Sequence, residues 1–401
     1  MFILSLYFFE QMLYNNYICI KWGAKGLEHY LDNSATTAVS RAAADKAYQV
    51  MTQLYGNPSS LHSKGMDAEH ELTQARAAVA ARLHASPAEL TFTSGGTEAN
   101  NLVLFGAAYA NMRVRRKIVI SAVEHSSVLE AARRLEDEGF AVGRIAPRAD
   151  GRIHPDDVAA AVDKNTALVS VMLVNNETGA VMPVADIFEA VREKNPQTLC
   201  HTDAVQAFGK LDIKARSLGA DCITVSGHKV HAPKGVGALW VKKGVRLIAR
   251  QYGGEQERRL RPGTENLPGI AALGVACGEF DIAANGAAVT ALNRYARERL
   301  TAIEGVTVNS PEAALPYVLS ITAGRVRSET MLHFLAERGV YVSSGSACAK
   351  GKPSHVLQAL GLSREQADST LRVSFCKYNT VEDIDALCEG IAAGLRTLAH
   401  R

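Results

Sequence analysis

From about residue 31 onward, short apolar runs alternate along the chain with amphipathic stretches of helical length. The apolar runs predict buried strands, and the amphipathic stretches predict helices, because their apolar residues recur at different periods. The expected strands are Leu90–Thr93, Lys117–Ile120, Ala167–Val174, Thr198–His201, Asp221–Val225 and Gly237–Val241, and the expected helices are Thr97–Asn111, Ser126–Gly139 and Val184–Lys194. This alternation predicts an α/β fold with a mainly parallel sheet, covered on both faces, whose ligands bind at the strand carboxyl ends.

The pattern changes near Gly278. Residues Glu279–Leu300 predict a long alanine-rich helix, and the remainder predicts a smaller α+β unit. We therefore expect a large domain over residues 27–277, whose first segment can pack with a small C-terminal domain over residues 278–401. Residues 1–26 contain no apolar run of the roughly 20 residues that span a bilayer, and they lack the pattern of a signal peptide. We expect them to lie outside the fold.

The composition of the 401 residues is that of a soluble globular protein, with 47% apolar and 21% charged residues. The net charge of +3 argues against direct nucleic-acid or membrane partners. None of the seven cysteines forms a CxxC pair, so neither a metal site nor a disulfide framework is expected. An odd number of scattered thiols fits a reducing compartment, and we expect a cytoplasmic protein.

Three candidate chemical features follow predicted strands. In Thr93–Asn100 a strand ends, two glycines turn the chain and a helix begins, which is the arrangement that binds phosphate through backbone N–H groups. Asp203 lies just past one strand, and Lys229 follows the next one in an apolar setting. Taken singly, Thr93–Asn100 also fits an ordinary strand-to-helix turn. An aspartate just past a strand, such as Asp203, is often only a helix cap.

Together these features predict a pyridoxal 5'-phosphate site. That cofactor requires a lysine that forms an imine, a carboxylate against the pyridine nitrogen and a phosphate cradle. His125 adds a flat ring at the end of another expected strand. By itself it would fit an ordinary interior or surface histidine equally well.

Nine short motifs follow one another along the chain: Tyr30–Thr37 (YLDNSATT), Gly56–Pro58 (GNP), Phe92–Asn101 (FTSGGTEANN), Val174–Gly179 (VNNETG), Asp203–Gln206 (DAVQ), Ser226–Lys229 (SGHK), Pro233–Gly237 (PKGVG), Arg261–Thr264 (RPGT) and Ser343–Cys348 (SSGSAC). Together they closely resemble the motifs of a known family, the NifS/IscS-like cysteine desulfurases of the class V aminotransferase superfamily. The resemblance runs collinearly from about Tyr30 to the C-terminus, and SGHK and SSGSAC are its most specific motifs.

The resemblance implies a large domain of the aspartate-aminotransferase-like type, known as PLP fold type I, in a homodimer whose sites straddle the interface. It implies that Lys229 bonds the cofactor and then moves protons. His125 is expected to stack on the ring and to act in acid–base steps, Asp203 to pair with the pyridine nitrogen, and Gln206 to hydrogen-bond the ring hydroxyl.

The resemblance also assigns the phosphate and substrate contacts. Thr264 is expected to reach the phosphate of the neighbouring subunit, and Asn176 to lie near the ring oxygen and the substrate. Asn33 and Arg372 are the expected clamp for the substrate carboxylate, because a guanidinium can hold a carboxylate through two parallel hydrogen bonds. The remaining phosphate ligands implied are Gly96, Thr97, Ser226 and His228.

Cys348 is the implied sulfur acceptor. L-Cysteine would yield L-alanine and a persulfide on Cys348, which then passes sulfur to a protein acceptor. The SSGSAC context is that of the long-loop group rather than the group with RxGHHC. Only Ala349–Lys352 separates Cys348 from Pro353, however, which is shorter than in the housekeeping members. The acceptor could therefore be an iron–sulfur scaffold or an enzyme of tRNA or cofactor thiolation.

Other functions remain open at this stage. Another class V enzyme, such as an aminotransferase or a selenocysteine lyase, would keep Lys229 and Asp203 without needing Cys348. A non-enzymatic sulfur carrier would not need the lysine and aspartate. A dinucleotide-binding protein is disfavoured because no GxGxxG motif is present.

Overall fold

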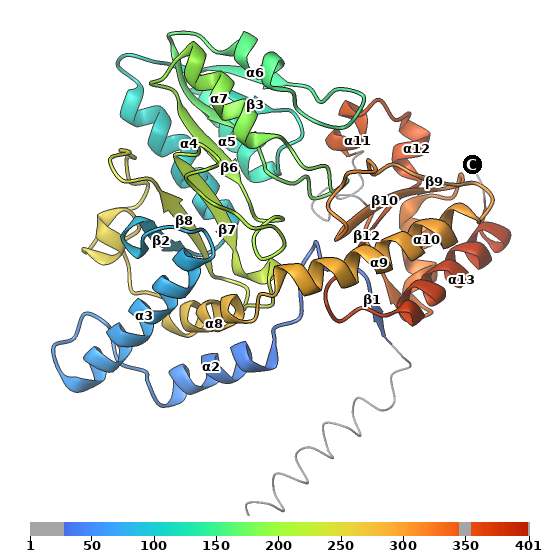
Figure 1. Ribbon diagram of the computed structural model, residues 1–401, viewed down its shortest axis with the longest axis horizontal. Coiled ribbons are helices and arrows are strands. Elements are labelled where there is room, and N and C mark those ends of the chain that lie inside the picture. Colours follow the sequence, from blue (N-terminus) through green and yellow to red (C-terminus); the bar gives the residue numbers. More distant parts are fainter. Residues whose placement is uncertain (1–27, 345–353, 400–401) are drawn as a thin grey trace, which may run out of the picture.

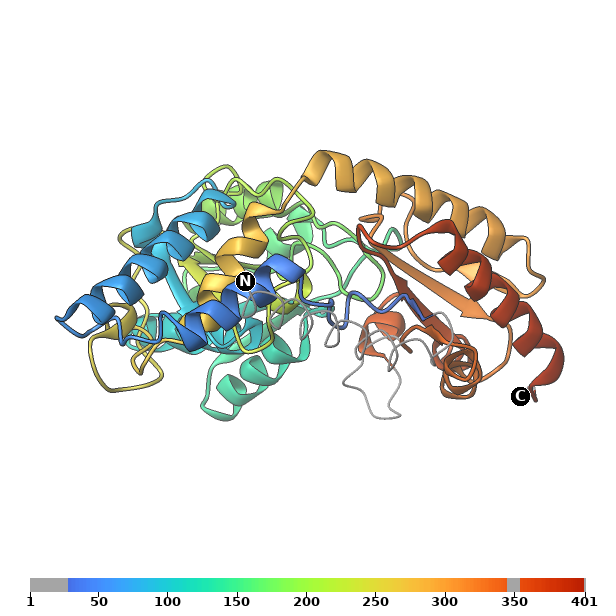
Figure 2. The ribbon, with the colours of Figure 1, turned by 90° about the horizontal axis from the view of Figure 1, so that it is seen from below.

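The computed structural model describes residues 28–344 and 354–399. Two domains lie side by side and are joined where α8 (Leu267–Gly278) meets α9 (Ile282–Thr301), two helices bent by 77° (Figures 1 and 2). Within the described ranges, no single helix is long and apolar enough to cross a membrane. The bent pair of α8 and α9 reaches that length and apolar composition only when the two helices are counted as one segment. Residues 1–27 and Cys348 lie outside the described residues.

The large domain contains a seven-stranded sheet in the order β2-β8-β7-β6-β5-β3-β4. Only β8 runs antiparallel to its neighbours β2 and β7, so the expected mainly parallel sheet is confirmed. The strands are β2 (Leu90–Thr93), β3 (Lys117–Ser121), β4 (Ala141–Ile145), β5 (Thr166–Ser170), β6 (Leu199–Asp203), β7 (Cys222–Ser226) and β8 (Gly237–Val241).

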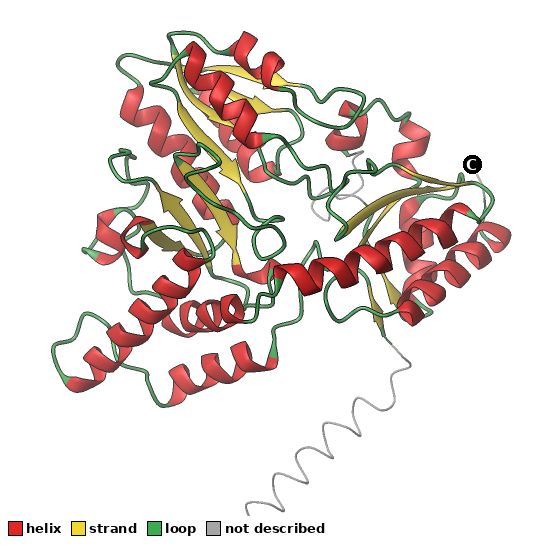
Figure 3. Ribbon diagram, in the orientation of Figure 1, coloured by secondary structure: helices red, strands yellow, loops and turns green. Residues whose placement is uncertain are grey.

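Helices cover this sheet (Figure 3). The helix α4 starts directly after β2, and its side chains are buried around most of its circumference, Leu102, Val103 and Leu104 among them. A helix of this kind must lie inside the domain, and its first turn is therefore fixed at the carboxyl edge of the sheet. The helices are α2 (Arg41–Thr52), α3 (Ser63–Ala81), α4 (Gly96–Asn111), α5 (Ser126–Asp137), α6 (Pro155–Ala161) and α7 (Val184–Lys194), with 3-10 turns η1 (Pro87–Glu89), η2 (Gly227–Lys229) and η3 (Gln256–Arg259).

The small domain is built on an antiparallel sheet in which β10 lies between β12 and β9. The first described segment belongs to it, because β1 (His29–Tyr30) pairs in parallel with β11 (Val340–Tyr341) and Asp32 bridges to Ser374. Its other elements are β9 (Val306–Val308), β10 (Val318–Ala323), β12 (Thr370–Ser374), α10 (Ser328–Ala336), α11 (His355–Ala359), α12 (Arg364–Asp368) and α13 (Val381–Thr397).

Two element boundaries differ from the sequence expectation by three residues or more. The long helix begins at Ile282 rather than Glu279, because the Asp281 carboxylate caps it by accepting the N–H of Ala284. Strand β5 ends at Ser170 rather than Val174. Residues 171–174 stay apolar and buried beside β6, so their hydrophobic pattern could not reveal where the regular strand ends.

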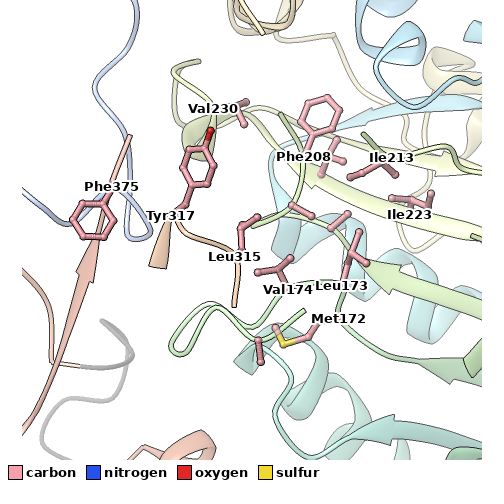
Figure 4. Close-up of a cluster of buried hydrophobic side chains, with 14 of the residues drawn as sticks. Met172, Leu173, Val174, Phe208, Ile213, Ile223, Val230, Leu315, Tyr317 and Phe375 are labelled. Carbon is pink, nitrogen blue, oxygen red and sulfur yellow. The ribbon is translucent and has the colours of Figure 1, made fainter. Parts of the chain in front are cut away.

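A continuous apolar core joins the two domains. Figure 4 shows Leu315, Tyr317 and Phe375 of the small domain beside the large-domain cluster that contains Val230 and Phe208. Because Val230 directly follows η2, this core also fixes the position of Lys229.

Candidate active site

A cavity of about 850 Å³ lies at the carboxyl ends of the parallel strands and extends to β12 and α11 of the small domain. Parallel strands end at one edge of a sheet, so residues distant in sequence meet there. Neither Asn33 nor Thr264 is among the lining residues. Of the residues predicted from the sequence, the lining includes Gly96, Thr97, His125, Asn176, Asp203, Gln206, Ser226, His228, Lys229 and Arg372.

The first turn of α4 forms an anion cradle. Its N-cap residue is Gly95, which makes no side-chain cap hydrogen bond and has a φ of 152°, a conformation that favours glycine. A Cβ atom on Gly96 would come within 2.9 Å of Val205 Cγ2, so the close packing here also requires glycine. The Ser226 hydroxyl is buried beside this turn and has no hydrogen-bond partner within residues 28–344 and 354–399. Uncapped N–H groups and an unpartnered hydroxyl suit a phosphate group.

Asp203 ends β6 with only 6% of its surface exposed. Its Oδ1 accepts the backbone N–H of Val205 at 2.9 Å, and its Oδ2 accepts Asn100 Nδ2 at 2.7 Å. These two donors fix the carboxylate plane within the cavity wall. Asn100 is itself held by its second N–H, which it donates to Ser127 Oγ at 2.9 Å.

Lys229 is held by the segment that follows β1. Its Nζ donates to the backbone oxygens of Ser34 and Ala35, both at 2.6 Å. The adjacent His228 is partly buried, and this burial lowers its pKa to about 4, with the Lys229 charge acting in the same direction. His228 is therefore neutral at pH 7 and can bind an anion only as a hydrogen-bond donor.

Gln206 links this segment to a second buried lysine. Its Nε2 donates to the Ser34 oxygen at 3.0 Å, and its Oε1 accepts Lys210 Nζ at 3.1 Å. Burial lowers the pKa of Lys210 to about 7. The contact of Gln206 with the ring hydroxyl of a cofactor stays a prediction.

His125 caps α5 and faces the cavity. Its Nδ1 accepts the N–H of Ser127 at 3.1 Å, so in the neutral ring the proton is on Nε2. Burial lowers the pKa of His125, and the Asp203 carboxylate opposes that shift. The imidazole therefore presents an N–H donor rather than a base.

Arg372 of β12 is 2% exposed. It donates from Nη2 to Asp32 Oδ1 at 2.9 Å and from Nη1 to the Asn176 backbone oxygen at 3.2 Å, while its buried Nε has no hydrogen-bond partner among the described residues. Burial raises the pKa of Asp32, and the Arg372 charge opposes this. A guanidinium with an unused N–H beside the cavity can bind a carboxylate.

Two predicted residues lie elsewhere. The Nδ2 of Asn33 donates within the small domain, to the Ser374 oxygen at 2.9 Å and to Asn379 Oδ1 at 3.1 Å. Asn33 lines a separate cavity of about 40 Å³ on the other side of Lys229. Thr264 is exposed on the surface. Their roles as ligands stay predictions.

Glu124, Glu177 and His355 are among the lining residues that were not assigned from the sequence. Glu124 is fully buried, which raises its pKa to about 8, and burial also raises the pKa of Glu177. His355 begins α11, and its Nε2 lies 3.0 Å from the Glu124 backbone oxygen. Glu124 directly precedes His125 in the chain. Its position in the sequence does not show whether its carboxyl group is buried or exposed to solvent.

Several buried side-chain atoms around the cavity have no hydrogen-bond partner in the described part of the chain. Leaving one such group unpaired costs about 1–3 kcal/mol, so their clustering indicates a polar ligand. The donors and acceptors together fit the phosphate, pyridine nitrogen and ring oxygen of pyridoxal phosphate. The unpartnered atoms are Ser34 Oγ, Asn100 Oδ1, Glu124 Oε2, Glu177 Oε1, Ser226 Oγ and Arg372 Nε.

The cysteines of the described ranges are all buried. Burial raises the pKa of Cys200 to about 12 and that of Cys388 to about 11, which disfavours the reactive thiolate. None of the described cysteines lines the large cavity. Cys348 lies outside these ranges, but the flanking Ser343 exchanges backbone hydrogen bonds with Arg372, and the flanking Ser354 donates to Glu177.

Comparisons with known proteins agree with this geometry. The sequence model of the family described as aminotransferase class-V matches residues 29–387. The cysteine desulfurase IscS of Methanosarcina thermophila is 38% identical over 365 residues, which cover 90% of both chains. A cysteine desulfurase of a Nostoc species is 40% identical over 368 residues, 90% of this chain and 91% of its own. A solved NifS-like protein superposes with a TM-score of 0.88 at 35% identity, over 93% of this chain and all of its own.

Proposed function

Since the chain belongs to the class-V aminotransferase family, we propose that it is a pyridoxal-phosphate-dependent cysteine desulfurase, which converts L-cysteine to L-alanine and retains the sulfur as a persulfide on Cys348. The observation that carries this proposal is the meeting of Lys229, Asp203 and Arg372 around one cavity beside an uncapped helix. The match to cysteine desulfurases along 90% of the chain does not favour an aminotransferase or a selenocysteine lyase.

The cofactor, when bound, supplies an aldehyde carbon for amines and a ring that accepts electrons from the substrate. The α4 N-terminus and Ser226 would hold its phosphate, and Asp203 would keep its pyridine nitrogen protonated. Arg372 binds the substrate carboxylate through its unused N–H. This contact orients the substrate so that Lys229 Nζ removes the proton from its Cα.

The sulfur step is assigned to the thiolate of Cys348. Supporting this assignment, the described thiols are buried and their pKa values raised, whereas the residues flanking the segment of Cys348 contact Arg372 and Glu177 at the cavity. Cys348 itself lies outside the described residues.

Replacing Cys348 by alanine is expected to abolish persulfide formation and cysteine turnover while leaving cofactor binding intact, because no other thiol of the described ranges lines the cavity. Alanine release and protein-bound sulfane sulfur are the measurements, with visible absorbance reporting the cofactor. Cys388→Ala in α13 is the matched control and should keep full turnover. Wild-type release of alanine by Cys348→Ala would contradict the assignment.

The same proposal includes a homodimer. Large apolar side chains are exposed on α2, on the connection that follows it and on α3, with Tyr55 68% and Leu61 98% exposed. Exposed apolar groups gathered in one region of a surface are typical of interfaces. A second copy covering this region is the arrangement in which the exposed Thr264 could reach a neighbouring phosphate site.

Tyr55→Asp combined with Leu61→Asp should convert the dimer to a monomer in sedimentation experiments and should weaken cofactor binding. Val114→Asp is the control, because Val114 is 70% exposed just beyond the C-terminal end of α4. A wild-type protein that sediments as a monomer would disprove the proposed dimer.

We further propose that the persulfide sulfur passes to a protein acceptor, either an iron–sulfur scaffold or an enzyme of tRNA or cofactor thiolation, in the cytoplasm. The unpaired cysteines of the described ranges support a reducing compartment.

A further inference from the structure

Three histidines of the described residues line the substrate cavity. His228 is assigned to the cofactor phosphate, and the hydrogen bonds of His125 and His355 give these two opposite roles. The Nδ1 of His125 accepts the backbone N–H of Ser127, which places the proton of the neutral ring on Nε2. His125 therefore offers a donor. A reaction that moves protons between sulfur and carbon also needs an acceptor, and His125 does not provide one in this arrangement.

His355 has the complementary arrangement. Its Nε2 lies 3.0 Å from the backbone oxygen of Glu124, and a carbonyl oxygen can only accept, so Nε2 carries the proton. The neutral ring then presents the lone pair of Nδ1, which has no hydrogen-bond partner in the described ranges. The backbone at His355 is held as well, because the preceding Ser354 caps α11 and donates its hydroxyl to Glu177.

The other titratable groups of the cavity are poor candidates for the proton acceptor that the reaction needs. Burial raises the pKa of Glu124 to about 8, so this carboxyl group favours its protonated form. Burial also raises the pKa of Glu177, whose Oε2 already accepts the hydroxyl of Ser354. Asp203 accepts from Val205 and Asn100 and is assigned to the pyridine nitrogen of the cofactor. Because His228 is assigned to the phosphate, His355 is the remaining histidine of the described lining that offers an unused acceptor, on a ring held by the Glu124 oxygen.

The position of His355 relates it to the substrate sulfur. Arg372 binds the carboxylate, and Lys229 lies at the amine, so the side chain of the substrate takes the remaining direction at Cα. The sulfur must also be accessible to the thiolate that removes it. His355 directly follows Ser354, which donates a hydrogen bond to the lining residue Glu177, and His355 lies close in the chain to Cys348.

We propose that His355 is a catalytic residue that receives the thiol proton of the substrate on Nδ1 and returns it to the carbon that loses the sulfur. The inference deepens the proposed desulfurase function and rests on it.

The step balances in atoms and charge. The electron pair of the Cys348 thiolate forms the new S–S bond, and the Cβ–S bond of the substrate breaks with its electron pair left on the carbon side. The S–H proton passes to Nδ1, because a persulfide is a stronger acid than a thiol. The same proton then moves from Nδ1 to Cβ and completes the methyl group of alanine. One negative charge begins on the Cys348 thiolate and ends on the terminal sulfur of the persulfide.

His355→Gln separates this role from a structural one. The amide nitrogen of glutamine can take the place of Nε2 and keep the hydrogen bond to the Glu124 oxygen, but glutamine places no base at the position of Nδ1. We expect kcat to fall by about 10²-fold or more, the usual contribution of a positioned proton-transfer group, with the KM for cysteine little changed. Thermal stability and the yield of pyridoxyl-Lys229 after borohydride reduction should match those of the wild type.

His355→Ala provides a second readout, since added imidazole should restore part of its turnover and should not affect His355→Gln. His333→Gln, an exposed position in α10, is the control and should behave as wild type. A folded, cofactor-loaded His355→Gln protein with wild-type kcat would overturn the inference. Alanine production by the wild type tests the desulfurase reaction separately, so the two failures are distinguishable.

Discussion

Lys229→Ala is expected to lose covalent attachment of the cofactor and to lower kcat for cysteine by about 10⁴-fold, the upper range for a positioned proton-transfer group. The reason is the double role of this amine, which bonds the cofactor aldehyde and moves the Cα proton. The backbone oxygens of Ser34 and Ala35 hold the Lys229 nitrogen in place, and alanine at position 229 offers no amine there.

The measurement is mass spectrometry of the borohydride-reduced protein together with an assay of alanine release. Wild-type protein should carry a pyridoxyl group on Lys229, and Lys214→Ala, an exposed control, should carry it too. Lys210 is the alternative attachment site for the cofactor. Burial lowers its pKa to about 7, so it also has a nucleophilic amine. A pyridoxyl group on Lys210 in the wild type would contradict the assignment.

Asp203→Asn is expected to reduce kcat by about 10²- to 10³-fold, the usual effect of removing one preorganised electrostatic contact. The carboxylate is oriented by donors from Val205 and Asn100, and its charge is what would keep the pyridine nitrogen protonated. An asparagine preserves the shape without the charge. The folded state should persist, because one amide oxygen can still accept from either donor.

Asp221→Asn is the matched control for this prediction. Asp221 is also a buried carboxylate next to a strand of the same sheet, but it pairs with Arg192 and with the N–H of Cys200, outside the cavity. Its replacement should lower thermal stability while leaving kcat per bound cofactor unchanged. Equal kcat values for Asp203→Asn and wild type, measured at full cofactor loading, would refute the role of Asp203.

The local part of the site followed directly from the chain. A buried strand is an apolar run and a turn needs glycine, so the sequence located the ends of β2, β6 and β7 and with them Gly96, Asp203 and Lys229. These residues meet because parallel strands place their carboxyl ends at one edge of the sheet. The alternation of strands and helices along the chain already implies that the strands run parallel.

The sequence by itself thus determined the mainly parallel sheet and the residues at its carboxyl edge, because each depends on contacts between neighbours along the chain. Only the tertiary structure decided which residues join them from a distance. It brought Arg372 and His355 of the small domain to the cavity, held Lys229 with oxygens from the segment after β1, and turned the Asn33 amide toward the small domain. The protonation of Glu124 and the acceptor face of His355 depend on burial and on partners far away in the chain, and no local pattern contains that information.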